Sequence, residues 1–240
     1  GNTCLSAIEN QAYGTIEEPI NHSKGCGGVM RVAPIGLYFE NKRYSADEID
    51  MIGAETAALT HGHTLGYIPA AGLVHIIQLV SHNGDITILE AVEDMKKAIA
   101  RQFANDKHLQ EFLNLIDNAI ELSKDEHIDD LKAIRKLGQG WVAEETLAIA
   151  IYCSLRYSDD FDKALIASVN HSGDSDSTGA VTGNIVGAYL GLKGIPQKYL
   201  DNLELREVIC EIADDLYNDC KITIYGSYHD KIWEQKYIYN

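Results

Sequence analysis

The sequence predicts an all-α protein, and three observations lead to that class. Apolar residues recur at the i, i+3, i+4 and i+7 spacing of a helix face along most of the chain, as in ILEAVEDMKKAI. Strand-like alternation is sparse outside residues 221–240. The 240 residues include only four prolines, so few positions interrupt a helix. We therefore expect one all-α domain over residues 1–240, because no linker is long enough to mark a boundary.

Caps and periodicity place the individual helices. Ser45, with Glu48 three residues later, is typical of a capping box that opens a helix. Asp160 caps a later helix, and Ser177 begins a segment rich in glycine and alanine. We expect a short, strand-like tail over residues 221–240. The expected helices cover residues 45–61, 67–81, 85–103, 107–123, 131–137, 142–157, 160–171, 177–191 and 203–219.

Composition excludes several classes of partner. The formal net charge is -16 and no basic patch offsets it, so we expect no direct contact with nucleic acid. The five cysteines are scattered and odd in number, which favours a reducing, cytoplasmic setting over a disulfide framework. The longest uninterrupted apolar run, residues 147–153, is far shorter than the roughly 20 residues of a membrane span.

The stretch HSGDSDSTG offers the clearest candidate metal site. Asp174, Asp176 and Ser177 present oxygen ligands at i, i+2 and i+3, and hard donors of this kind select Mg²⁺, Mn²⁺ or Ca²⁺. An EF-hand is excluded because its twelfth position, Ile185, is not a glutamate. The alternative is an acidic N-cap with no ligand. The glycine-rich helix behind the cluster predicts a central, buried helix that its neighbours approach closely.

A second candidate is the glycine-rich stretch NHSKGCGGVMRVAPIG. Gly25, Gly27 and Gly28 leave backbone N–H groups open to an anion, although a plain turn before a helix explains the pattern equally well. Arg31 is suited to a phosphate, but an internal salt bridge is the commoner role. The stretch matches neither a Walker A loop nor a dinucleotide fingerprint.

Two further segments contain candidate pocket residues. His61 and His63 in LTHGHTLGY suggest zinc only weakly, because no third ligand is apparent and a histidine at a helix end is more often a cap. Trp141 follows a Gly-x-Gly turn in LGQGWVAEE. It either lines a pocket or plugs the core.

Taken together, the four segments resemble the ADP-ribosylglycohydrolase family. The stretches GCGGVMRVAPIG, LTHGHTLGY, GQGWVAEE and GDSDSTGAVTGNIVGAYLG occur in the order and spacing of that family's conserved blocks. The resemblance extends from the first residues to about residue 195. It implies a compact, multi-helix orthogonal bundle, a centre of two Mg²⁺ or Mn²⁺ ions, and removal of ADP-ribose from a modified side chain or small molecule.

The resemblance also assigns roles to individual residues. Asp174, Asp176 and Ser177 match one half of the metal site, and the two carboxylates are the implied catalytic groups that orient water or accept its proton. Cys26 stands where some members have asparagine, and His63 does not carry the resemblance. The residues that match the ADP-ribose cleft are Ser23, Lys24, Gly25, Cys26, Gly27, Gly28, His61 and Trp141.

One family feature is missing from this sequence. The Thr-Asp-Asp run that supplies the other metal ligands does not occur before Ile35, so we expect an N-terminally truncated fold that supplies half of the site. Association through the apolar surface exposed in this way is expected as well. The alternatives are a non-catalytic ADP-ribose-binding or structural relative, and a helical interaction domain with an incidental acidic cap. The linkage that is cleaved (to arginine, serine, a DNA base or a small molecule) stays open.

Overall fold

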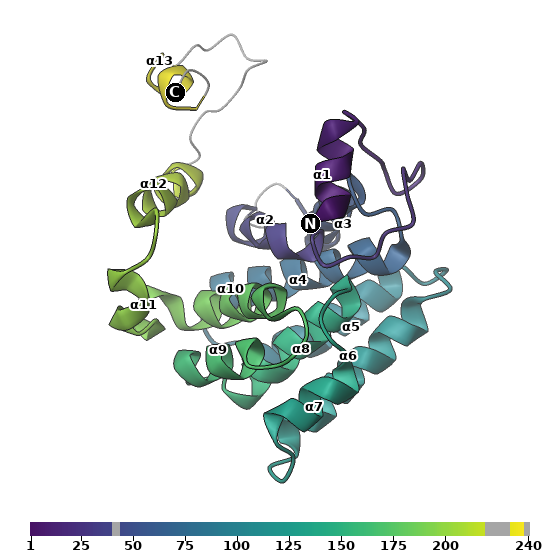
Figure 1. Cartoon of the computed structure of the whole chain (residues 1–240), viewed down its shortest axis with the longest axis vertical. Helices are drawn as coiled ribbons and strands as arrows, with labels where there is room; N and C mark the ends of the chain where they lie inside the picture. The colour runs from purple at the N-terminus through teal and green to yellow at the C-terminus, as the bar shows by residue number, and fades with distance from the viewer. Residues whose placement is uncertain (40–43, 219–230, 238–240) are drawn as a thin grey trace. The chain divides into compact units, whose positions relative to one another are not determined.

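Helix α4 (Thr64–His82) lies in the middle of the helices of residues 1–196 in the computed structural model (Figure 1). All residues from 65 to 78 are buried, and the helix contacts η1, α2, α3, α5, α8 and α10. An 18-residue window of α4 has a mean hydropathy of 1.4, and 83% of that window is buried within the protein. By length and composition α4 is thus apolar enough for a membrane span, but here its apolar surface is the protein core.

The structure describes residues 1–39, 44–218 and 231–237, whose regular elements are helices, with no strand element among them. The prediction of an all-α fold is confirmed. Two compact units, Gly1–Pro196 and Gln197–Asn240, are described separately, and a single domain stays a prediction. The first unit contains α1 (Asn2–Glu9), η1 (Val29–Arg31), α2 (Ala33–Tyr38), α3 (Ala46–Ala58), α4, α5 (Ile88–Gln102), α6 (Leu109–Lys124), α7 (Asp130–Leu137), α8 (Ala143–Arg156), α9 (Phe161–Val169) and α10 (Ser175–Gly194). The second contains α11 (Gln197–Asp201), α12 (Arg206–Tyr217) and α13 (Lys231–Tyr237).

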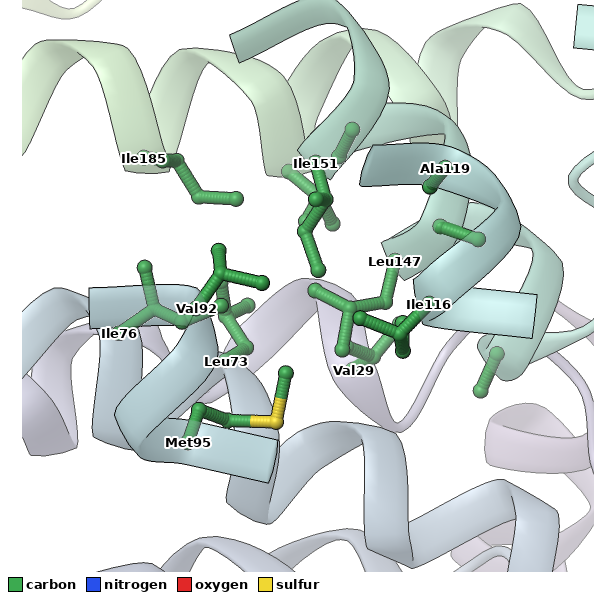
Figure 2. Packing of buried hydrophobic residues seen from close by; sticks show 14 of the residues in the cluster. Val29, Leu73, Ile76, Val92, Met95, Ile116, Ala119, Leu147, Ile151 and Ile185 are labelled. Carbon is green, nitrogen blue, oxygen red and sulfur yellow. The ribbon is translucent and has the colours of Figure 1, made fainter. Parts of the chain in front are cut away.

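Side chains from η1 and from helices α2 to α10 form the core of the first unit. Burying one side chain such as valine, leucine or isoleucine stabilises the folded state by about 1.5–3 kcal/mol, so this core is the main source of stability. Figure 2 shows ten of these fully buried residues facing one another: Val29 from η1, Leu73 and Ile76 from α4, Val92 and Met95 from α5, Ile116 and Ala119 from α6, Leu147 and Ile151 from α8, and Ile185 from α10.

Two predictions about the fold are wrong. The glycine-rich helix α10 is not the central helix, because α4 takes that place and α10 is only partly buried. A side chain at Gly179 would collide with Val169, but Gly183 has no neighbour within 4 Å, so close approach explains only part of the glycine content. Residues 231–237, expected to be strand-like, are helical, and the rest of the predicted tail lies outside the described residues.

Candidate functional site

Asp174 occupies the N-cap position of helix α10, but its side chain makes no capping hydrogen bond. The backbone N–H of Asp174 donates to the Gln139 carbonyl oxygen at 2.7 Å, and no side-chain cap bond is present at this helix start. The carboxylate instead accepts from the Cys26 thiol and from the Ser177 hydroxyl, each 2.9 Å from Oδ2. An acidic cap therefore does not account for Asp174, whose side chain is committed to a tertiary cluster.

The charges in this cluster are balanced by hydrogen bonding. Burial opposes ionisation of Asp174, but hydrogen bonds from Asp176, Cys26 and Ser177 lower its pKa overall. A hydrogen bond with Asp174 and the nearby negative charge raise the pKa of Asp176. Burial and the bond to Asp174 raise the pKa of Cys26 to about 11, so its sulfur is a protonated donor at neutral pH. Two carboxylates this close favour a shared proton or a cation.

The glycine loop, residues 23–28, is held against the segment that precedes α8. Gly25 forms an isolated antiparallel bridge with Val142, the Cys26 N–H donates to the Trp141 carbonyl at 3.3 Å, and the Ala143 N–H donates to the Lys24 carbonyl at 2.9 Å. Within the described residues, the N–H groups of Gly27 and Gly28 make no hydrogen bond. Gly27 is half-buried, whereas Gly28 is buried against Ala57 and His61, so Gly27 is the better placed of the two to meet an anion.

Ser23 and Lys24 tie the loop to other helices. The Ser23 hydroxyl contacts that of Thr3 at 3.0 Å, and its carbonyl accepts from the His63 N–H at 3.2 Å. The Lys24 ammonium pairs with Glu144, a buried carboxylate whose second oxygen has no partner in the described part of the chain. Burial raises the pKa of Glu144 in spite of the lysine, so the pair is held in a poorly solvated place.

His61 lies beneath the loop and is 2% exposed. Its ring contacts the bare faces of Gly25 and Gly27, where an added Cβ would be 3.3–3.6 Å from ring atoms. Burial and the positive charge of Arg31 lower the pKa of His61 to about 4, so the ring is neutral at pH 7. His63 caps α4 by accepting the Leu65 N–H at 3.0 Å, which confirms the capping interpretation for that residue.

Trp141 meets the glycine loop only through its main chain. Its side chain is 58% exposed, so it is not a core plug. The indole lines a cavity of about 890 Å³ between the end of α7 and the loop before α10, together with Arg135, Glu145 and His171. Neither the glycine loop nor Asp174 lines this cavity, so the ring stays outside the cluster formed by Cys26 and Asp174.

The donor set fits a hard divalent cation as a partial site. Asp174 and Asp176 offer carboxylate oxygens and Ser177 a hydroxyl oxygen, and six or more ligands are usual for Mg²⁺ or Ca²⁺. Within residues 1–39, 44–218 and 231–237, no three His, Cys, Asp or Glu side chains gather closely enough to hold a metal. The residues present therefore supply at most half of such a centre.

Sequence reasoning missed several neighbours of the site. Glu144 is separated from Lys24 by 120 residues, and no local pattern distinguishes it from the adjacent Glu145. Thr60 precedes His61 and contacts its ring, but carried no signal of its own. Arg31 was expected in a salt bridge; within the described residues it donates to the Thr56 carbonyl and the Thr60 hydroxyl instead.

Comparison with known proteins identifies the family to which this arrangement of glycine loop and acidic cluster belongs. A profile of the ADP-ribosylglycohydrolase family matches residues 1–223, and the chain belongs to this family. Among individual relatives, an uncharacterized protein of Archaeoglobus fulgidus is 31% identical over 199 residues, covering 81% of this chain and 58% of that protein. The human ADP-ribosylhydrolase ARH3 is 28% identical over 221 residues, with 81% of this chain and 58% of the relative covered.

Two further comparisons agree. The ADP-ribosyl-[dinitrogen reductase] glycohydrolase of Rhodospirillum rubrum is 26% identical over 208 residues, covering 86% of this chain and 60% of its own. A solved structure described as an ADP-ribosylglycohydrolase-related protein complex superposes with a TM-score of 0.55 at 26% identity, covering 82% of this chain and 60% of that one. The chain thus spans about three fifths of the length of these relatives.

Proposed function

We propose that this chain provides the ADP-ribose cradle and half of a divalent-cation site in a hydrolase that releases ADP-ribose from a modified side chain or small molecule. The hydrogen bond between the Cys26 thiol and Asp174 Oδ2 carries this proposal. It joins the loop suited to a diphosphate to the carboxylates suited to a cation, although 148 residues separate them in the chain.

The loop is suited to the anionic part of the ligand. The N–H groups of Gly27 and Gly28 have no hydrogen-bond partner within the described residues, Gly27 being half-buried and Gly28 buried, and Lys24 adds a positive charge that it shares with Glu144. Local donors of this kind are necessary because the net charge of -16 otherwise repels a diphosphate. His61, neutral and buried, adds a polar ring atom on the inner side of the loop.

The reaction requires a water molecule at the anomeric carbon of the ribose. The water oxygen bonds to that carbon while the bond to the modified group breaks, and the departing group takes up a proton. Asp176 is exposed and adjoins Asp174, so it is the carboxylate that an incoming water reaches. Asp174 and Ser177 are buried and fixed, which suits residues that hold and orient.

We propose Mg²⁺ or Mn²⁺ at this site, held by Asp174, Asp176 and Ser177 and completed by ligands from outside the described cluster. When bound, two such ions supply positive charge that polarises water and offsets the charge of the diphosphate. The oxygen-only donor set supports hard cations over zinc.

Thermal unfolding of the 240-residue chain with Mn²⁺ and ADP-ribose tests the proposal. A ligand present at 100 times its Kd stabilises the folded chain by about 2.7 kcal/mol, which is a readily measured rise in Tm. We expect Asp174→Asn to abolish the rise. Asp85→Asn, at an exposed loop position, makes the same chemical change away from the cluster and should leave the rise intact.

The outcomes separate the parts of the proposal. No rise in Tm for the unmodified chain with Mn²⁺ and ADP-ribose together contradicts binding by this cluster and loop. A rise that Asp174→Asn preserves contradicts the cation role of Asp174. A rise with ADP-ribose alone that Asp174→Asn leaves unchanged assigns binding to the glycine loop and removes the carboxylates from the site.

A further inference from the structure

Arg31, Thr60 and His61 form a short chain of hydrogen bonds beneath the glycine loop. The guanidinium of Arg31 donates through Nη2 to the Thr56 carbonyl at 2.7 Å and to the Thr60 hydroxyl at 2.8 Å. The same hydroxyl lies 2.8 Å from Nδ1 of His61. The three side chains are half-buried or buried, so water does not readily replace these partners.

The direction of each bond follows from what each group can donate. A guanidinium only donates, so Thr60 Oγ1 accepts from Arg31. The hydroxyl has one other polar contact within the described residues, Nδ1 of His61, so its hydrogen is satisfied only by pointing there. The opposite arrangement, with a hydrogen on Nδ1, leaves the threonine hydrogen without an acceptor and costs about 1–3 kcal/mol when buried.

A neutral imidazole with a bare Nδ1 carries its hydrogen on Nε2. The low pKa of His61, caused by burial and by the charge of Arg31, supports the neutral ring. No hydrogen bond to Nε2 is present in the part of the chain that the structure describes. The atom lies 3.5 Å from where a Cβ on Gly25 would be and 3.4 Å from where one on Gly27 would be.

Nε2–H is therefore a donor beside the bare faces of Gly25 and Gly27. This space, the notch, is also bordered by Cys4 Sγ, which lies 3.2 Å from where a Cβ on Gly27 would be. His61 is 98% buried, so holding an unpaired donor there without a ligand is unfavourable. An oxygen atom seated in the notch satisfies it. Any side chain at Gly25 or Gly27 would occupy the same space and exclude that oxygen.

We propose that Arg31 and Thr60 are positioning residues, which hold His61 in the Nε2–H form so that it donates to an acceptor oxygen of the ligand in the notch of the glycine loop. The inference rests on the proposed function for the identity of that ligand, whose phosphoryl and hydroxyl groups both supply acceptor oxygens. The tautomer assigned to His61 does not depend on the proposed function.

Nuclear magnetic resonance of the full chain with ¹⁵N-labelled histidine tests the state of the ring without any ligand. His61→Gln identifies the His61 signals by their loss. We expect the unmodified chain to show the hydrogen on Nε2, and Thr60→Ser, which keeps the hydroxyl, to show the same. Thr60→Val has nearly the same shape but no hydroxyl, and it should give a mixture of both neutral tautomers.

Thr182→Val is the matched control. It removes a buried threonine hydroxyl of α10 that has no hydrogen-bond partner among the described residues, and it should leave the His61 signals unchanged. A hydrogen on Nδ1 in the unmodified chain overturns the proposal directly, even if Thr60→Val does not fold. Retention of the pure Nε2–H form in Thr60→Val overturns it as well.

Calorimetric titration with ADP-ribose in the presence of Mn²⁺ gives the second readout. We expect Thr60→Val to bind about tenfold more weakly, the effect of one lost hydrogen bond, and Thr60→Ser and Thr182→Val to bind as the unmodified chain does. Equal affinity for Thr60→Val overturns the positioning role. If the unmodified chain does not bind ADP-ribose, the proposed function fails, whereas the tautomer spectra still decide the role of Arg31 and Thr60 on the ring.

Discussion

Replacing His75 with leucine should destabilise the protein strongly, because this histidine joins two carboxylates. Nδ1 of His75 lies 2.8 Å from Asp50 Oδ2, and Nε2 lies 3.2 Å from Asp94 Oδ2. Since ionised carboxylates only accept, both ring nitrogens donate and His75 is an imidazolium. Burial disfavours that charge, but the bonds and charges of Asp50 and Asp94 raise the pKa of His75 overall.

The two partners contribute unequally. Asp50 is fully buried, and its other oxygen already lacks a partner in the described structure. Removing the imidazolium leaves this carboxylate with the Gln102 amide, 2.8 Å from Oδ2, but without a positive charge, and breaking a buried pair in this way costs about 3–5 kcal/mol. The Asp94 side chain is 56% exposed, so solvent screens its attraction to His75. Asp94→Asn should therefore cost less than about 1 kcal/mol of unfolding free energy. We expect His75→Leu to lose about 3–5 kcal/mol of unfolding free energy at pH 6.

Urea unfolding followed by circular dichroism measures both variants. A raised folded-state pKa means that the contribution of His75 is complete below its unfolded pKa of about 6.5 and declines as pH rises through the folded value. The difference in unfolding free energy between the unmodified chain and His75→Leu should therefore become smaller from pH 6 towards alkaline pH. A cost below about 1 kcal/mol at pH 6, or a gap that does not change with pH, refutes the reasoning.

Two further predictions concern packing and a buried hydroxyl. Gly36→Ala places a Cβ 2.7 Å from the Val74 carbonyl oxygen and should cost about 1–3 kcal/mol, whereas Gly84→Ala meets no atom within 4 Å and should stay within about 0.5 kcal/mol; comparing their Tm values tests this. Tyr152→Phe removes a 2.6 Å hydrogen bond to Asp130 and should cost about 1 kcal/mol in urea unfolding, and an unchanged midpoint contradicts that role.

The parts of the fold that depend on local chemistry could be predicted from sequence. Ser45 accepts from the Glu48 N–H while the Glu48 side chain accepts from the Ser45 N–H, which is the capping box that the spacing predicted. Asp160 caps α9 as expected, by accepting from the Lys163 N–H. Each cap is complete within a few residues, so its pattern survives in a single sequence.

The glycine-rich helix shows where local reasoning stops. The many glycines of α10 indicate that another segment can pack closely against this helix. Which segment does so depends on how distant parts of the chain pack. The core position went to α4, whose buried stretch is longer and more uniformly apolar. The presence of a helix was therefore predictable from sequence in this region, whereas its degree of burial was not.

The candidate site was likewise predictable from sequence only in part. Asp174 and Ser177 meet Cys26 of the glycine loop in the structure, and both segments had been singled out because each carries an unusual local pattern. The pairing of Lys24 with Glu144, and of Thr60 with Arg31, arises only from tertiary contact between ordinary residue types. The cation-ligand roles of Asp174, Asp176 and Ser177 stay predictions.

The central place of α4 has a consequence for synthesis of the chain. Its apolar surface is covered in part by α8 and α10, and α10 leaves the ribosome roughly a hundred residues after α4, which takes about 5–20 s at ordinary translation rates. During that interval the nascent chain presents a helix with the hydropathy of a membrane span to the surrounding solution. Holdase chaperones, which bind extended apolar segments, would find their clearest target in residues 64–82.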